Sequence, residues 1–118
     1  MGQPVAWFEI VSPDAERAWK FYTELFGWTA EADPEMGGYA LVDTGAGEGA
    51  IGGGIGPSSA PGDTGVKIYV RVDDLEASLD RAKKLGGTQV VPPTDLPGEF
   101  GRFAIFTDPD GNQVGLWG

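Results

Sequence analysis

The chain carries the same pattern twice, at an offset of about 60 residues. The stretch from Asp14 to Gly27 is echoed by the stretch from Asp74 to Gly87: each opens with Asp-x-Glu after an apolar run, continues through spaced apolar residues and closes on a glycine. Short repeats predict a solenoid, whereas two copies of this length predict two like modules packed as one domain. A functional site is then expected between the modules.

The first copy predicts a strand, a helix and three further strands. Branched and aromatic residues predict a strand over residues 5–11. Ser12 before a proline is typical of a helix start, and Gly27 predicts the end of that helix. Residues 28–44 hold two more predicted strands, and residues 50–55 a weaker, glycine-rich one.

The second copy predicts the same order. A strand over residues 66–72 precedes a helix that Asp73 is predicted to cap, with Glu76 three residues on in a capping-box arrangement. Apolar residues are expected to form the buried stripe of this helix; they are Leu75, Leu79, Ala82 and Leu85. The three strands that follow are predicted over residues 89–91, 102–107 and 113–117, the last two joined by the turn residues 108–112.

The expected fold class is therefore α+β, with two βαβββ modules curled around a shared cleft. The whole chain, residues 1–118, is predicted to be one domain. Module 1 spans residues 4–56, residues 57–65 form a linker rich in proline, serine and glycine, and module 2 spans residues 66–118.

Composition narrows the partners and the chemistry. The net charge of −10, from 18 acidic and 8 basic residues, disfavours nucleic acid and anionic membranes as partners. The chain has no cysteine, so a disulfide framework, a thiol nucleophile and a sulfur-ligated zinc site are excluded. No leader-like or long apolar segment stands out, and a cytoplasmic protein is predicted.

The two copies resemble the vicinal oxygen chelate superfamily, which includes glyoxalase I, extradiol dioxygenases and bleomycin resistance proteins. The stretches that carry the resemblance are Asp14 with residues 21–28, and residues 72–75, 85–87 and 106–112. It covers nearly the whole chain and implies the fold above and a homodimer. It says less about function, because one fold hosts many chemistries.

Enzymes of this superfamily are similar in binding a divalent metal through histidine and glutamate on the first and last strands of each module. The resemblance carries these four positions onto Trp7, Gly52, Lys67 and Gly115, none of which is a usual metal ligand. The chain also contains no histidine, the commonest metal ligand and general base. No metal and no cofactor are therefore predicted; the alternative that stays open is a weak magnesium or calcium site made of carboxylate oxygens.

Strand alternation predicts which side chains would line the cleft instead. If Trp7 faces the cleft, Glu9 does too, while Phe8 and Ile10 face the helix. The ligand-binding candidates come from three of the four first and last strands and are Trp7, Glu9, Lys67, Tyr69, Arg71, Gln113 and Trp117. Aromatic walls with a few polar groups are typical of small-molecule sites, and Glu9 is the candidate catalytic base.

A structural interpretation of the same residues stays open. Glu9 could pair with Lys67 or Arg71 to bridge the modules, with both tryptophans in the core. The sequence from Gly47 to Gly52 matches the dinucleotide-binding pattern, but no helix is predicted after it and phosphate binding is not expected.

Two functions follow. The first is a metal-independent protein that binds a small molecule, such as an antibiotic or an aromatic metabolite that it sequesters. The alternative is a metal-independent lyase or isomerase that acts on an anionic or carbonyl-containing metabolite, with Lys67 or Arg71 holding the anion and Glu9 as base. A degenerate member that keeps the fold without a site is a third, structural reading.

Overall fold

The computed structural model describes residues 2–58 and 65–118, which group into two compact units. Residues 7–66 form the N-terminal unit, and residues 67–118 together with 1–6 form the C-terminal unit. The middle of the predicted linker, residues 59–64, lies outside the described residues. The prediction of a single domain with modules at 4–56 and 66–118 stays a prediction.

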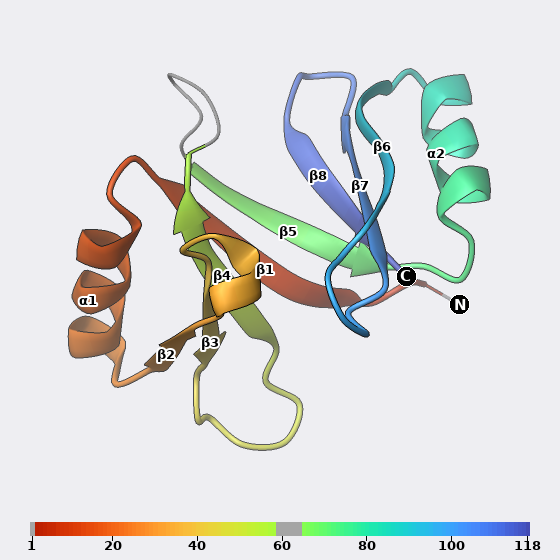
Figure 1. Ribbon diagram of the computed structural model, residues 1–118. Coiled ribbons are helices and arrows are strands. Elements are labelled where there is room, and N and C mark those ends of the chain that lie inside the picture. Colours follow the sequence, from red (N-terminus) through yellow and green to blue (C-terminus); the bar gives the residue numbers. More distant parts are fainter. Residues whose placement is uncertain (1, 59–64) are drawn as a thin grey trace. The chain divides into compact units, whose positions relative to one another are not determined.

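The N-terminal unit contains one helix against a four-stranded sheet (Figure 1). Its elements are β1 (Val5–Ser12), α1 (Ala15–Phe26), β2 (Thr29–Ala32), the 3₁₀ turn η1 (Pro34–Met36), β3 (Ala40–Asp43) and β4 (Gly52–Pro57). The strands lie in the order β2-β3-β4-β1, with β1 and β4 parallel and the other pairs antiparallel. The first two residues of β1 group with the C-terminal unit.

The C-terminal unit repeats this plan. Its elements are β5 (Gly65–Arg71), α2 (Leu75–Lys84), β6 (Thr88–Asp95), β7 (Arg102–Thr107) and β8 (Gln113–Trp117). The first two residues of β5 group with the N-terminal unit. The strands lie in the order β5-β8-β7-β6, and again the first and last strands of the copy are the parallel pair. The α+β class and the two βαβββ modules are thus confirmed, and the shared cleft stays a prediction.

Each sheet buries one face under its helix. In the N-terminal unit the buried core is Ile10, Val42 and Ile55, against which partly buried aromatic residues pack. In the C-terminal unit the core consists of Val72, Leu75, Leu79, Ala104 and Leu116. The helix of each unit covers only one face of its sheet, so the side chains that alternate with these core residues lie on the opposite face.

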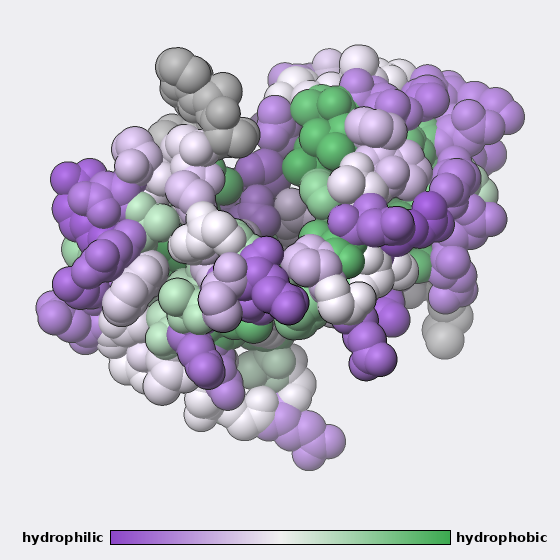
Figure 2. All heavy atoms as spheres, in the orientation of Figure 1, coloured by the Kyte–Doolittle hydropathy of each residue, from purple (hydrophilic) through white to green (hydrophobic). Residues whose placement is uncertain are grey.

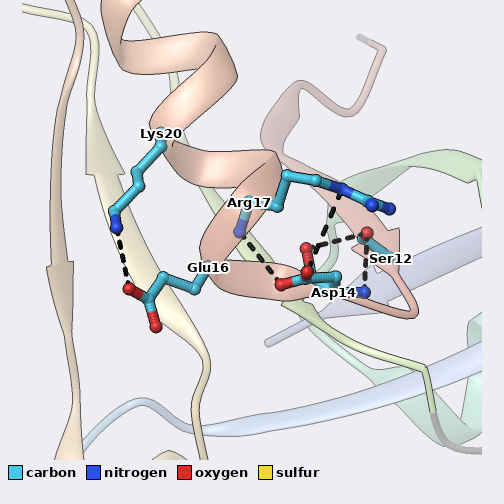
Figure 3. A network of polar contacts seen from close by, with 5 residues as sticks. All are labelled: Ser12, Asp14, Glu16, Arg17 and Lys20. Carbon is cyan, nitrogen blue, oxygen red and sulfur yellow. Dashed lines mark hydrogen bonds and ion pairs between the residues drawn. The ribbon is translucent and has the colours of Figure 1, made fainter.

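Both predicted helix starts were misplaced. The cap of α1 is Asp14, whose Oδ1 accepts a hydrogen bond of 3.1 Å from the Arg17 amide, while Ser12 Oγ accepts one from the Asp14 amide (Figure 3). The cap of α2 is Asp74, which accepts from the Ala77 amide at 3.0 Å. The repeat itself pairs Asp14 with Asp74, and it locates the caps better than the proline or the capping-box pattern does.

The first turns of α1 also carry exposed ion pairs. Lys20 Nζ lies 2.9 Å from Glu16 Oε1, and the hydrogen bond to Glu16 is the main cause of the raised pKa of Lys20. Arg17 Nε lies 4.0 Å from Asp14 Oδ2 (Figure 3). Exposed i, i+3 and i, i+4 pairs of this kind add only tenths of a kilocalorie, so packing stabilises the helix more than they do.

The remaining differences lie at element ends. β4 runs over 52–57 rather than 50–55, and β6 extends to Asp95 as an edge strand whose register shifts near Pro92 and Pro93, where an edge tolerates proline. Leu85 is 66% exposed, so the buried stripe of α2 ends before it. Figure 2 shows hydrophilic side chains over the outer side of α2, at the right of the view.

The predicted turn between β7 and β8 is confirmed and held by one carboxylate. Asp108 Oδ1 accepts from the Asp110 and Asn112 amides at 2.9 Å, and Oδ2 accepts from Asn112 Nδ2 at 2.9 Å. The side-chain bond from Asn112 is the first cause of the lowered pKa of Asp108.

No helix in the described ranges is both long and apolar enough to cross a membrane.

One ion pair ties α2 to the sheet and makes stability depend on pH. Arg102 donates two hydrogen bonds to Glu76, at 2.8 and 2.9 Å, and these lower the pKa of Glu76 from 4.5 to about 2. A depressed carboxyl pKa gives stability that is present above the unfolded-state value and is lost as pH falls toward the folded-state value. Glu76→Gln should therefore destabilise the protein at neutral pH, with a difference that shrinks as pH falls from about 4.5 toward about 2.

Urea unfolding midpoints of wild type and variant across that pH range measure this difference. Because the pair is exposed, the effect should be small, and Glu99→Gln, an exposed carboxylate on the loop before β7, is the matched control. A Glu76→Gln difference that stays constant with pH would contradict the pairing.

Candidate functional site

The polar face of the N-terminal unit starts from two residues of β1. Phe8 and Ile10 pack with the α1 side chains Ala18, Trp19 and Tyr22, so the alternation of the strand turns Trp7 and Glu9 to the face opposite α1. This confirms the predicted orientation of the strand. Trp7 and Glu9 are both half-buried.

Tyr39, just before β3, connects these two side chains. Trp7 Nε1 donates to the Tyr39 hydroxyl at 3.0 Å, and the same hydroxyl donates to Glu9 Oε2 at 3.1 Å. A tryptophan and a carboxylate of β1 and a tyrosine from the loop before β3 thus form one hydrogen-bonded chain, which we call the Trp7–Tyr39–Glu9 chain.

The glycines of β4 make room for these rings. An added Cβ at Gly54 would overlap the phenol of Tyr39, and one at Gly56 would overlap the same ring. A Cβ at Gly52 would lie 3.1 Å from Cζ3 of Trp7. β4 lies between β3 and β1, so the Tyr39 side chain must cross β4 to reach Glu9. It can do so because β4 has only glycines on the face that carries Trp7 and Glu9.

The C-terminal unit has a corresponding face, built from β5 and β8. Val70 and Val72 pack on the α2 side, which confirms the predicted orientation and leaves Tyr69 and Arg71 on the other face. The buried Tyr69 ring lies over Gly115, its partner in the parallel register. Aromatic rings over glycines are therefore common to both units.

Arg71 and Trp117 form the cationic part of this second face. The guanidinium of Arg71 lies 4.9 Å from the centre of the Trp117 ring, and Trp117 Nε1 donates to the Phe100 carbonyl at 2.6 Å. The carbonyl fixes the indole, and the indole supports an exposed cation. Lys67 is half-buried near the start of β5, and Gln113 is exposed at the start of β8.

The seven predicted site residues thus fall into two groups, one in each unit. Trp7 and Glu9 are joined by Tyr39, while Tyr69, Arg71 and Trp117 are neighbours through the β5–β8 register. Their roles as ligand contacts, and that of Glu9 as base, stay predictions, as does the alternative pairing of Glu9 with Lys67 or Arg71.

Sequence reasoning missed Tyr39. The signal that could have found it is the alternation of Gly52, Gly54 and Gly56, because three glycines on one face of a strand leave space that an aromatic ring from a neighbouring strand fills. Tyr39 directly precedes the strand next to them.

The four positions that carry the metal ligands in similar enzymes do not fit a metal here. Trp7, Gly52 and Gly115 offer no ligand side-chain atom, and Lys67 offers only an ammonium group. Rings cover both glycines, Trp7 over Gly52 and Tyr69 over Gly115. Across the described ranges, no three histidine, cysteine, aspartate or glutamate side chains gather as a metal would require.

A shallow hollow elsewhere in the C-terminal unit holds none of the predicted site residues. Its lining comes from α2 and β6 and includes Asp74, Glu76, Asp80, Lys83 and Gln89. Glu76 is already paired with Arg102, so we assign no ligand to this hollow.

The contact of Tyr39 with the glycines can be tested by filling the space. Gly54→Ala should push the phenol away from Glu9 and destabilise the unit by about 1–3 kcal/mol, as overpacking does. Urea denaturation measures the loss, and the indole N–H resonance of Trp7 reports the broken bond. Gly2→Ala, which meets open space, is the control.

A double variant identifies the clashing partner. If Tyr39 is the obstacle, Tyr39→Ala with Gly54→Ala should cost less than the two single changes added together. Additive losses would show that Gly54 is required for another reason.

Comparison with known proteins agrees with a fold of two βαβββ units. The sequence profile of the Glyoxalase/Bleomycin resistance protein/Dioxygenase superfamily matches residues 5–116. The protein "Putative glyoxylase CFP32" of Mycobacterium tuberculosis (strain CDC 1551 / Oshkosh) is 34% identical over 115 residues, covering 94% of this chain and 44% of that protein. "Anthracycline biosynthesis protein DnrV" of Streptomyces peucetius is 33% identical over 129 residues, covering 95% of this chain and 46% of that protein.

Among solved structures, the hypothetical protein BH1468 of Bacillus halodurans C-125 shares the fold with a TM-score of 0.70 at 15% identity, covering 99% of this chain and 94% of that one. The chain spans less than half the length of the two relatives above. Because the superfamily profile covers both βαβββ units, the chain belongs to the glyoxalase/bleomycin resistance protein/dioxygenase superfamily.

Proposed function

We propose that this protein is a metal-independent small-molecule binding protein of the glyoxalase/bleomycin-resistance type, which sequesters an antibiotic or an aromatic metabolite. The observation that carries the proposal is the Trp7–Tyr39–Glu9 chain on the helix-free face of the N-terminal unit. A face with two aromatic rings and one oriented carboxylate offers stacking together with a single polar anchor, which is how small-molecule sites obtain affinity and orientation.

The metal independence rests on donor chemistry. Rings and glycines replace ligands at three of the family positions, and the fourth is a lysine. A metal would need ligands that these positions do not supply.

The names of the relatives support a choice of probe. The Streptomyces peucetius relative is named for anthracycline biosynthesis, so an anthracycline is a suitable aromatic antibiotic to test. Since the chain covers 46% of that relative, the activity of the whole relative is itself only a proposal for this chain.

The residues of the C-terminal face supply the second half of the proposal. We propose that Lys67, Tyr69, Arg71, Gln113 and Trp117 also contact the ligand, with Arg71 as a second polar contact. Its guanidinium is held over the Trp117 ring at 4.9 Å, and an arginine fixed in this way loses less freedom on binding an anionic or carbonyl group.

A second function is favoured by one observation. The hydrogen bond from Tyr39 orients Glu9, and an oriented carboxylate is what a general base requires. The alternative proposal is therefore a metal-independent lyase or isomerase with Glu9 as base, acting on an anionic or carbonyl-containing metabolite. The Mycobacterium tuberculosis relative named as a putative glyoxylase supports testing carbonyl substrates.

We propose, from the family, that the protein is a cytoplasmic homodimer. Light scattering coupled to size-exclusion chromatography measures the assembly, and a mass of one chain at micromolar concentration would contradict it.

Binding and metal dependence can be measured together. Titration with daunorubicin, an anthracycline, should quench tryptophan fluorescence and raise the unfolding temperature, equally with and without EDTA. Elemental analysis that finds one zinc, iron or nickel per chain, with binding lost to chelator, would contradict metal independence. Product formation from carbonyl metabolites that Glu9→Gln abolishes would favour the enzyme.

The role of Arg71 gives a separate prediction. If Arg71 contacts the ligand, Arg71→Met should weaken binding by roughly 1.5–3 kcal/mol while folding stability changes little, as loss of a charge-assisted hydrogen bond does. Lys67→Met should act in the same direction. The matched control is Arg81→Met, an exposed arginine on α2.

The bridging alternative predicts the reverse pattern. Glu9→Gln would then destabilise the unliganded protein, and ligand affinity would be indifferent to changes at Glu9, Lys67 and Arg71. Affinity that stays unchanged alongside lost stability would rule out the ligand contact.

A further inference from the structure

We infer that Tyr39 is a positioning residue that fixes the Glu9 carboxylate as a hydrogen-bond acceptor, so that this face selects aromatic ligands carrying a donor group over those carrying an anion. The inference rests on the proposed function and adds the chemical class of ligand that the same face would take. It starts from the direction of the two hydrogen bonds in the Trp7–Tyr39–Glu9 chain.

That direction follows from the groups themselves. An indole N–H can only donate, so at 3.0 Å from Trp7 Nε1 the Tyr39 oxygen must accept. A phenol has one proton, which is then left for the bond of 3.1 Å to Glu9 Oε2. Glu9 Oε2 therefore accepts, whatever the positions assigned to hydrogens.

The phenol is held at both ends. At the backbone, the Tyr39 carbonyl accepts from the Asp33 amide at 3.0 Å and the Tyr39 amide donates to the Met36 carbonyl at 3.3 Å, which closes the loop around η1. Along its length, the ring lies against Gly54 and Gly56. Loop, glycines and indole hold the phenol oxygen in place, and turning its proton away would break the bond to Glu9 Oε2.

The consequence is a carboxylate whose orientation is set before any ligand arrives. A group that accepts through a fixed oxygen favours ammonium or hydroxyl donors over a carboxylate or phosphate, which has no proton to donate. The neighbouring Trp7 ring supplies a surface for an aromatic body. An aromatic amine combines a donor with an aromatic body, whereas an aromatic carboxylate has the aromatic body without the donor.

The positioning role is tested on the protein without ligand. Tyr39→Phe keeps the ring and removes the hydroxyl, so the indole N–H resonance of Trp7 and the side-chain carboxyl carbon resonance of Glu9 should both shift at neutral pH. Tyr22→Phe, on α1, removes a hydroxyl from the opposite side of the sheet and should shift neither. Unchanged Trp7 and Glu9 resonances in Tyr39→Phe would overturn the inference.

Selectivity is tested with two naphthalene probes of similar size, 1-naphthylmethylamine and 1-naphthoate, followed through the Trp7 resonance. Wild type should bind the amine about 10-fold or more tighter, a difference that one charge-assisted hydrogen bond supplies. Tyr39→Phe should reduce that preference, and Glu9→Gln should abolish it, while the unfolding midpoint of Tyr39→Phe shows that the fold is kept.

The outcomes distinguish failure of the ligand selectivity from failure of the binding function. Equal binding of both probes, or a preference that survives Glu9→Gln, overturns the selectivity and leaves the binding function standing. Failure of both probes and of daunorubicin to bind, with the resonance shifts of Tyr39→Phe present, overturns the binding function and with it the selectivity, and keeps the positioning role of Tyr39.

Discussion

The helix-free face of the N-terminal unit depends on one contact, in which the ring of Tyr39 lies against the glycines of β4. Tyr39 can lie across β4 only because Gly54 and Gly56 present backbone where other residues present a Cβ. Glycine in a strand weakens it, since it loses more backbone entropy and buries no side chain. Packing of the Tyr39 ring on the strand, together with its hydrogen bonds to Trp7 and Glu9, offsets part of this loss of stability. The polar chain and the glycine-rich strand therefore require each other.

Contacts of the same kind occupy three of the four positions that carry metal ligands in similar enzymes. Trp7 and Gly52 are partners in the parallel β1–β4 register, so a bulky residue at one is matched by an empty position at the other. Tyr69 and Gly115 are partners in the β5–β8 register in the same way. A single change to histidine or glutamate at either glycine would meet a ring before it met a metal. A ligand side chain at either glycine would therefore need a second change at its ring partner.

Much of the fold was predictable, because the repeat, the alternation in β1 and β5 and the turn at residues 108–112 are each fixed by local chemistry. The β7 and β8 ranges and both βαβββ orders were correct. The helix caps were two residues and one residue off, since a serine before proline and an Asp-Asp pair each offer more than one cap. Tyr39 was missed because its place depends on the strand order β3-β4-β1, which alternation within single strands does not contain.

The directed chain also bears on the choice between binding protein and enzyme. A base must take a proton from its substrate, and a carboxylate that already accepts from Tyr39 has one of its oxygens engaged. The oxygen that accepts from Tyr39 is held in the orientation that anchors a donor group of a ligand. The same bond that orients Glu9 therefore favours recognition over proton abstraction, and for this reason we place binding before catalysis.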